Sequence, residues 1–193
     1  IKWNKVFVLT GEKLKMKKLK TVTLTECALM VALSAVLGTL SIFKMPNGGS
    51  ITLGGEAPII IVSLRHGAYY GLISGFVYAL VQIFTGFHPP PAKNICSYIV
   101  VILLDYIIPC VCLGSARFFY DNFKHHKILC SSFTVMFIRY VSLVMSGVII
   151  WKDLFPPTAF ALQYSAIYNC TYMIPETIIT CLVCLIIHKH KMF

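Results

Sequence analysis

Long apolar runs alternate with short polar connections along most of the chain. The longest run without an acidic or basic residue, histidine counted as neutral, extends over residues 66–92 and exceeds the roughly 20 residues that a helix needs to cross the hydrocarbon core of a bilayer. Segments of alternating polarity, which are typical of barrel strands, are missing. The pattern therefore predicts an all-α protein, an integral membrane bundle of six transmembrane helices.

The polar breaks set the expected limits of the helices. We expect spans at about residues 21–43, 56–64, 68–87, 95–117, 128–151 and 161–188. The glycines and the proline of residues 44–55 predict an irregular, mobile loop that acts as a lid over a site. Residues 21–193 would form one membrane domain, and residues 1–20 a basic cytoplasmic arm whose first fifteen residues are either an upstream extension before Met16 or a surface arm.

Composition agrees with a membrane protein and the charges indicate its orientation. The chain of 193 residues is 58% hydrophobic and 12% charged, with a formal net charge of +10. Its basic residues lie at the expected helix ends and in the N-terminal arm, which indicates topology rather than nucleic-acid binding. With six spans, 13 of the 17 lysines and arginines fall on the side of the termini. The positive-inside rule then predicts that both termini are cytoplasmic.

Asp105 is the main candidate for a binding residue. It interrupts the apolar segment VILLDYIIP, and an ionised group within a membrane span costs roughly 2.5 to 3.5 kcal/mol on insertion scales. Such a residue usually has a partner or borders a water-filled cavity. The alternative is an acid near a helix end whose carboxylate reaches the headgroups.

Several polar and aromatic residues are expected at the same depth as Asp105. At 1.5 Å per residue, Tyr106, Trp151, Tyr164 and Asn169 fall in the same outer layer of the bundle. Singly, Trp151 and Tyr164 are equally typical of the aromatic belt at a membrane interface. Together with the acid they favour a cavity for a small, flat, cationic ligand, because rings present their negative faces to a cation.

Arg139 and Glu176 are predicted to form a structural ion pair, with substrate contact as the alternative. They lie midway along adjacent antiparallel spans, and opposite charges at the same depth in hydrocarbon are expected to pair. The eight cysteines lie mostly inside apolar runs and are interpreted as packing residues rather than metal or redox ligands. The sequence lacks the common hydrolase and phosphate-loop motifs, so we expect no catalytic residues, no metal and no cofactor.

Seven segments of the chain carry a resemblance to a known family. They are Leu24 to Glu26 with Ala28 and Ala32, then KMPNGGSITL at 44–53, PIIIVSLRHG at 58–67, LLDY at 103–106, GVIIW at 147–151, YSAIYN at 164–169 and MIPE at 173–176. In this order and spacing the chain resembles the thiamine-specific substrate-binding components (S components, ThiT type) of energy-coupling-factor (ECF) vitamin transporters. The resemblance extends over about residues 21–188.

The resemblance implies a function and partners. It implies a protein of the bacterial plasma membrane that captures thiamine from outside and associates with a transmembrane coupling subunit and two cytoplasmic ATPases, which use ATP. Ala28 and Ala32 would contact the coupling subunit, although small residues at helical spacing are equally consistent with packing inside the bundle. The ligand would be bound by Asp105, Tyr106, Trp151, Tyr164, Asn169 and Gly147, and the gate would comprise Lys44, Pro46, Gly48, Gly49 and Ser50.

The chain also departs from the family pattern. Leu143 stands where some relatives carry a ligand-facing histidine, and Gly49 where some carry a tryptophan. Tyr98 or His88, on either side of the proline-rich connection, would be substitutes. The alternatives are therefore an S component for another vitamin or cationic heterocycle, and a membrane protein without a transport role.

Overall fold

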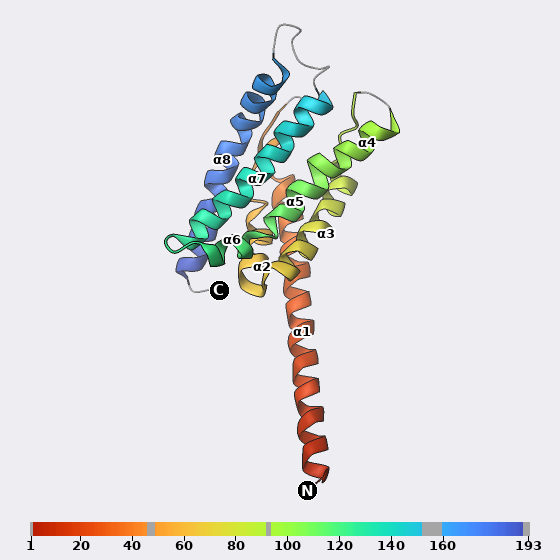
Figure 1. The fold of residues 1–193 in the computed structure, drawn as a ribbon, viewed down its shortest axis with the longest axis vertical. Coiled ribbons are helices and arrows are strands. Elements are labelled where there is room, and N and C mark those ends of the chain that lie inside the picture. Colours follow the sequence, from red (N-terminus) through yellow and green to blue (C-terminus); the bar gives the residue numbers. More distant parts are fainter. Residues whose placement is uncertain (1, 46–48, 92–93, 152–159, 191–193) are drawn as a thin grey trace.

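The computed structural model describes residues 2–45, 49–91, 94–151 and 160–190, and for residues 2–19 the backbone alone. It is a helical bundle with one small hairpin (Figure 1). Its elements are α1 (Lys2–Thr39), β1 (Ser41–Lys44), β2 (Ser50–Thr52), α2 (Ala57–His66), α3 (Ala68–Gly86), α4 (Ile95–Val101), the π-helical turn η1 (Ile102–Ile107), α5 (Ile108–Leu113), α6 (Ala116–Asn122), α7 (Lys127–Ile149) and α8 (Ala161–Lys189).

Five segments of the described chain are long and apolar enough to cross a membrane. They are Lys20–Thr39, Ala68–Gly86, Ile95–Leu113, Lys127–Ile149 and Ala161–Lys189. The second expected span, α2, has 10 residues and therefore a length of about 15 Å, half the thickness of the hydrocarbon core. The described part of the chain thus contains five helices of spanning length and one short apolar helix.

The helix α2 belongs to the core of the bundle. Every residue from Ala57 to Leu64 is buried, as expected for a helix that is apolar all round. Polar contacts fix its C-terminal end: Glu26 of α1 pairs with Arg65 at 3.2 Å and with His66 at 2.6 Å. In addition, the Ser63 hydroxyl donates to the carbonyl oxygen of Gly114.

The segment after α1 differs from the sequence prediction. The first span was expected to continue to Phe43 and residues 44–55 to be irregular, but Ser41–Lys44 and Ser50–Thr52 form an antiparallel hairpin in which Phe43 is opposite Ile51. The segment Ser41–Lys44 has four residues and no strict alternation of polar and apolar positions, so its sequence did not indicate a strand. This part of the chain is consequently a regular hairpin rather than an irregular loop.

Close contact between α3 and α5 depends on glycine. A methyl group added to Gly71 would lie 2.6 Å from Cβ of Ser63 and would collide with the Gly114 carbonyl, and one added to Gly75 would collide with the Cys110 carbonyl. The small residues therefore allow the helix backbones to approach each other. Gly67, one turn earlier, has open space around it and instead joins α2 to α3 with a φ of 96°.

Candidate ligand-binding site

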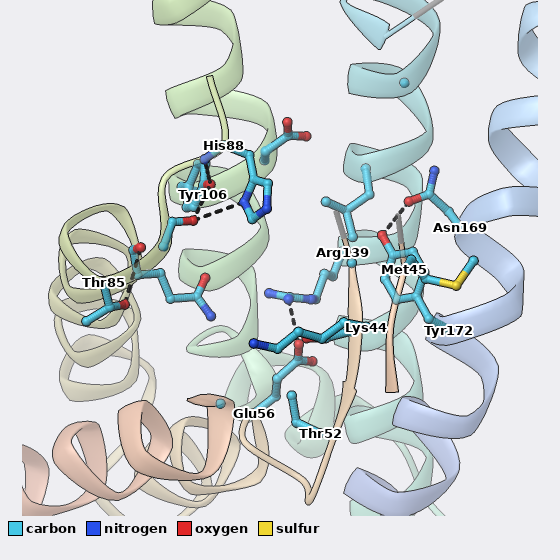
Figure 2. A pocket seen from close by; sticks show the side chains of 18 of the residues that line it. Lys44, Met45, Thr52, Glu56, Thr85, His88, Tyr106, Arg139, Asn169 and Tyr172 are labelled. Atoms are coloured by element: carbon cyan, nitrogen blue, oxygen red, sulfur yellow. Dashed lines mark hydrogen bonds and ion pairs between the residues drawn. The ribbon is translucent and has the colours of Figure 1, made fainter. Parts of the chain in front are cut away.

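A cavity of about 440 Å³ lies between the β1–β2 hairpin and helices α3, η1, α7 and α8. This volume is within the range of roughly 300 to 1,000 Å³ that is usual for small-molecule sites. Its walls carry acidic, basic, amide and aromatic side chains, which is unusual inside an apolar bundle (Figure 2). The cavity is therefore the candidate site.

The helix that carries Asp105 is locally widened. Over Ile102–Ile107 the backbone adopts π-helical bonding, in which the N–H of Ile108 donates to the carbonyl of Leu103. The cause is Pro109, which has no N–H to offer the carbonyl of residue 105, four positions earlier. Single π turns inside helices frequently occur at functional sites, and this one carries both Asp105 and Tyr106 into the wall of the cavity.

Asp105 is held by an indole rather than by a cation. Nε1 of Trp151 donates to Oδ2 of Asp105 at 3.1 Å. In the described part of the chain, no basic side chain lies within 4 Å of this carboxylate. The carboxylate is thus left with acceptor capacity for a ligand.

Tyr106 binds the backbone at the C-terminal end of α3, next to the cavity. Its hydroxyl donates to the carbonyl of Gly86 at 3.1 Å and accepts from the backbone N–H of His88 at 2.9 Å. Its ring lies 5.6 Å from that of Phe87. The hydroxyl is consequently engaged with the chain that leaves α3, and the residue itself lines the cavity.

The α8 wall carries Tyr164, Tyr168 and Asn169. Nδ2 of Asn169 donates to the carbonyl of Ser165 at 2.9 Å, and its Oδ1 accepts from the hydroxyl of Tyr172 at 2.5 Å. These contacts fix the amide with its oxygen toward Tyr172 (Figure 2). Asn169 therefore contributes an oriented amide to the α8 side of the cavity.

The predicted pair between Arg139 and Glu176 is wrong. Arg139 pairs instead with Glu56, with 2.6 Å between Nη2 and Oε1, and both residues line the cavity. The carboxylate of Glu176 accepts from the backbone N–H of Thr52 at 2.6 Å and from its hydroxyl. The reason is that the buried start of α2 brings Glu56 to α7, while the hairpin covers Glu176; equal depth in adjacent helices was an insufficient criterion.

The other predicted residues fall into three groups. His88, Gly147, Lys44, Gly49 and Ser50 line the cavity, and so does Leu143. Tyr98 is not among the lining residues; its ring stacks on Phe87 at 6.1 Å. Ala28 and Ala32 are exposed on α1, and Pro46 and Gly48 lie outside the described residues.

Sequence reasoning missed part of the lining. Glu56, Tyr78, Gln82, Thr85 and Tyr172 also border the cavity. The regular spacing of tyrosines at 164, 168 and 172 was a signal for one polar face of α8, because residues four apart lie on the same side of a helix. Nothing comparable marked Glu56, which directly precedes the apolar run Ala57–Val62.

An apolar helical bundle with a cavity that is lined by a carboxylate held by an indole, an oriented amide and several rings defines a membrane protein that binds a small polar solute. The model of one family, described as "Thiamine transporter protein (Thia_YuaJ)", matches residues 24–193. The chain belongs to this family. It is a multi-pass bacterial membrane protein with a transport role, not an enzyme.

Two relatives agree with this assignment. The chain is 32% identical over 175 residues to the "Thiamine transporter ThiT" of Bacillus subtilis (strain 168), a match that covers 84% of this chain and 88% of the relative. A solved structure of ThiT from Listeria monocytogenes matches with a TM-score of 0.67 at 19% identity and covers 89% of this chain and 95% of the other. This second match concerns the fold.

Proposed function

We propose that this chain is the substrate-binding subunit of an ECF-type transporter and that it captures thiamine from outside the cell. The observation that carries the proposal is the Asp105 carboxylate, which borders the cavity, is held by Trp151 and has no basic side chain within 4 Å among the described residues. Thiamine is cationic and has two flat rings, a thiazolium and an aminopyrimidine, joined by a methylene group. A negative group beside aromatic rings complements both features.

In this proposal the residues that line the cavity have different roles toward the ligand. Asp105 accepts from the exocyclic amine of the pyrimidine or balances the positive ring, and the Trp151 and Tyr164 rings flank the ligand. The Asn169 amide oxygen accepts a further hydrogen bond, while Tyr106, Gly147 and His88 complete the wall. Because Glu56 and Arg139 neutralise each other, Asp105 is the acidic group of the wall that is left for a cation, and Lys44 is the basic one.

The proposal includes a membrane arrangement. The chain has six inserted segments, α2 being a short one, and both termini are cytoplasmic, because 13 of its 17 basic residues would then lie on the inner side. Residues 1–20 form the basic cytoplasmic arm. Figure 1 is consistent with this arrangement, because the N-terminal end of α1 and the C-terminal end of α8 lie toward the same end of the bundle. Ala28 and Ala32, exposed on α1, contact the coupling subunit, and two ATPases supply the energy.

A second candidate is a different vitamin or cationic heterocycle. Leu143 and Gly49 border the cavity where some relatives carry a histidine and a tryptophan, so two contacts of those relatives are missing. A competition experiment on the purified protein separates the two candidates. Radiolabelled thiamine is bound first, and unlabelled thiamine, its pyrimidine half or its thiazolium half is then added as the competitor. If thiamine binds and its halves compete more weakly, the first candidate holds. If micromolar thiamine does not bind but another cationic heterocycle does, the second replaces it.

A further inference from the structure

One face of α8 links the cavity to the hairpin. Asn169, Tyr172 and Glu176 are spaced by three and four residues, so they lie on one side of the helix, and all three are buried. Asn169 lies in the wall of the cavity, and Glu176 binds Thr52 of β2 through two hydrogen bonds. Tyr172 lies between them.

Tyr172 has a separate contact at each end of its side chain. Its hydroxyl donates to Oδ1 of Asn169, a residue in the wall of the cavity. Its ring supports the hairpin at Gly49: a methyl group added to Gly49 would lie 2.7 Å from Cε1 of the ring.

The hairpin can approach the ring this closely because residue 49 is glycine. Gly49 has a φ of 83°, a conformation that side chains disfavour, and its carbonyl accepts from the N–H of Met45 at 3.0 Å. The contact is thus between backbone and ring, with no side chain to absorb a displacement. A shift of the hairpin away from α8 would release the ring.

We propose that Tyr172 is a positioning residue that couples the β1–β2 hairpin to Asn169. When the hairpin lies on the ring, the hydroxyl is held against the amide oxygen and the acceptor is fixed for the ligand. When the hairpin lifts, the ring is free to move, and Asn169 loses the donor that orders it. The inference rests on the proposed function, because the consequence is measured as retention of thiamine.

The test is a double-mutant cycle on the thiamine dissociation rate. Tyr172→Phe keeps the ring and removes the hydroxyl, and Gly49→Ala displaces the hairpin from the ring. We expect Tyr172→Phe to speed dissociation about three- to tenfold, the range for one lost hydrogen bond. Because Gly49→Ala already separates the hydroxyl from Asn169, the double variant should release thiamine no faster than the faster single variant.

Two matched controls separate coupling from general damage. Tyr140→Phe removes another tyrosine hydroxyl bound to α8, on the Ala166 carbonyl outside the cavity, and should leave dissociation unchanged. Gly67→Ala strains another glycine of positive φ where no atom lies within 4 Å. It should not be coupled to Tyr172→Phe.

Each outcome decides one question. Multiplied effects in the double variant would overturn the role of Tyr172 while leaving thiamine binding intact, whereas absence of thiamine binding in the unmodified protein would overturn the proposed function itself. If Gly49→Ala does not fold, hydrogen exchange of residues 50–52 in Tyr172→Phe replaces the cycle. Thiamine should protect these amides less than in the unmodified protein, and equal protection would contradict the coupling.

Discussion

Asp105 and Arg139 are charged residues in similar apolar helices, yet their surroundings differ. Arg139 is neutralised by Glu56 at 2.6 Å, whereas Asp105 receives one hydrogen bond from an uncharged indole. A buried charge without a partner is costly, and a protein retains it where a ligand supplies the counter-charge. At the scale of residues, the carboxylate that lacks a cation is the one suited to bind.

Asp105→Asn should weaken thiamine binding at least tenfold while the protein still inserts. The amide keeps the shape but removes the charge, and a charge-assisted hydrogen bond is roughly twice as strong as a neutral one. Equilibrium binding to purified protein measures the effect. Asp121→Asn, which removes an exposed acid paired with Arg117, is the control and should bind normally. Equal affinity in Asp105→Asn and the unmodified protein would exclude Asp105 from the site.

The Glu56 and Arg139 pair should be coupled in stability. Breaking a buried ion pair by removing one charge costs about 3 to 5 kcal/mol, because the other charge is left unpaired. Glu56→Gln and Arg139→Gln should each lower the melting temperature of the ligand-free protein, and the double variant should recover part of the loss. The same cycle with Glu176→Gln should show less coupling. If the melting temperature recovers when Arg139→Gln is combined with Glu176→Gln, but not when it is combined with Glu56→Gln, the observed pairing is contradicted.

Among the elements, the apolar runs predicted α2, α3, α7 and α8 well, whereas the hairpin and the shortest helical pieces were not foreseen. The limits of α3, α7 and α8 are within two residues of the expected spans, since long apolar runs leave little choice in a membrane. The hairpin, η1 and α6 were missed. Each is shorter than the window over which a pattern can be recognised, and η1 arises from one proline inside a helix.

Gly71→Ala should destabilise the packing of α3 on α5. The added methyl group meets Ser63 and the Gly114 carbonyl, and overpacking of a core typically costs about 1 to 3 kcal/mol. The melting temperature in detergent should fall. Gly86→Ala, at the open end of α3 where no atom lies within 4 Å, is the control and should melt like the unmodified protein. Similar melting of Gly71→Ala would mean that the two helices are not in close contact.

For the molecule as a whole, the sequence was sufficient to predict the class of protein and its family, but not the contacts between side chains. The apolar runs and the order of the family segments were sufficient for a helical membrane transporter. The partners of Arg139, Glu176 and Tyr106 depend on how short elements fold back on the bundle, and helical spacing carries no information about that. The site residues that were found, such as Asp105, were those whose chemistry is costly in any apolar helix.

The orientation of the bundle can be tested with cysteine labelling. Cys96, at the start of α4, is exposed, and Cys130 lies near the start of α7. With both termini cytoplasmic, a membrane-impermeant maleimide should label a variant retaining only Cys96 in intact cells. A variant retaining only Cys130 should react after permeabilisation. The reverse result would invert the topology and place the opening of the cavity inside the cell.

The central claim is that the cavity beside Asp105 binds thiamine, and fluorescence titration of the purified protein tests it most directly. The chain has two tryptophans, Trp3 and Trp151, and Trp151 lines the cavity. Thiamine should quench the emission saturably at micromolar concentration or below, and Trp3→Phe should retain this quenching because Trp151 is the responding indole. Absence of saturable quenching in the Trp3→Phe variant, together with no thiamine retained on equilibrium dialysis, would contradict the account.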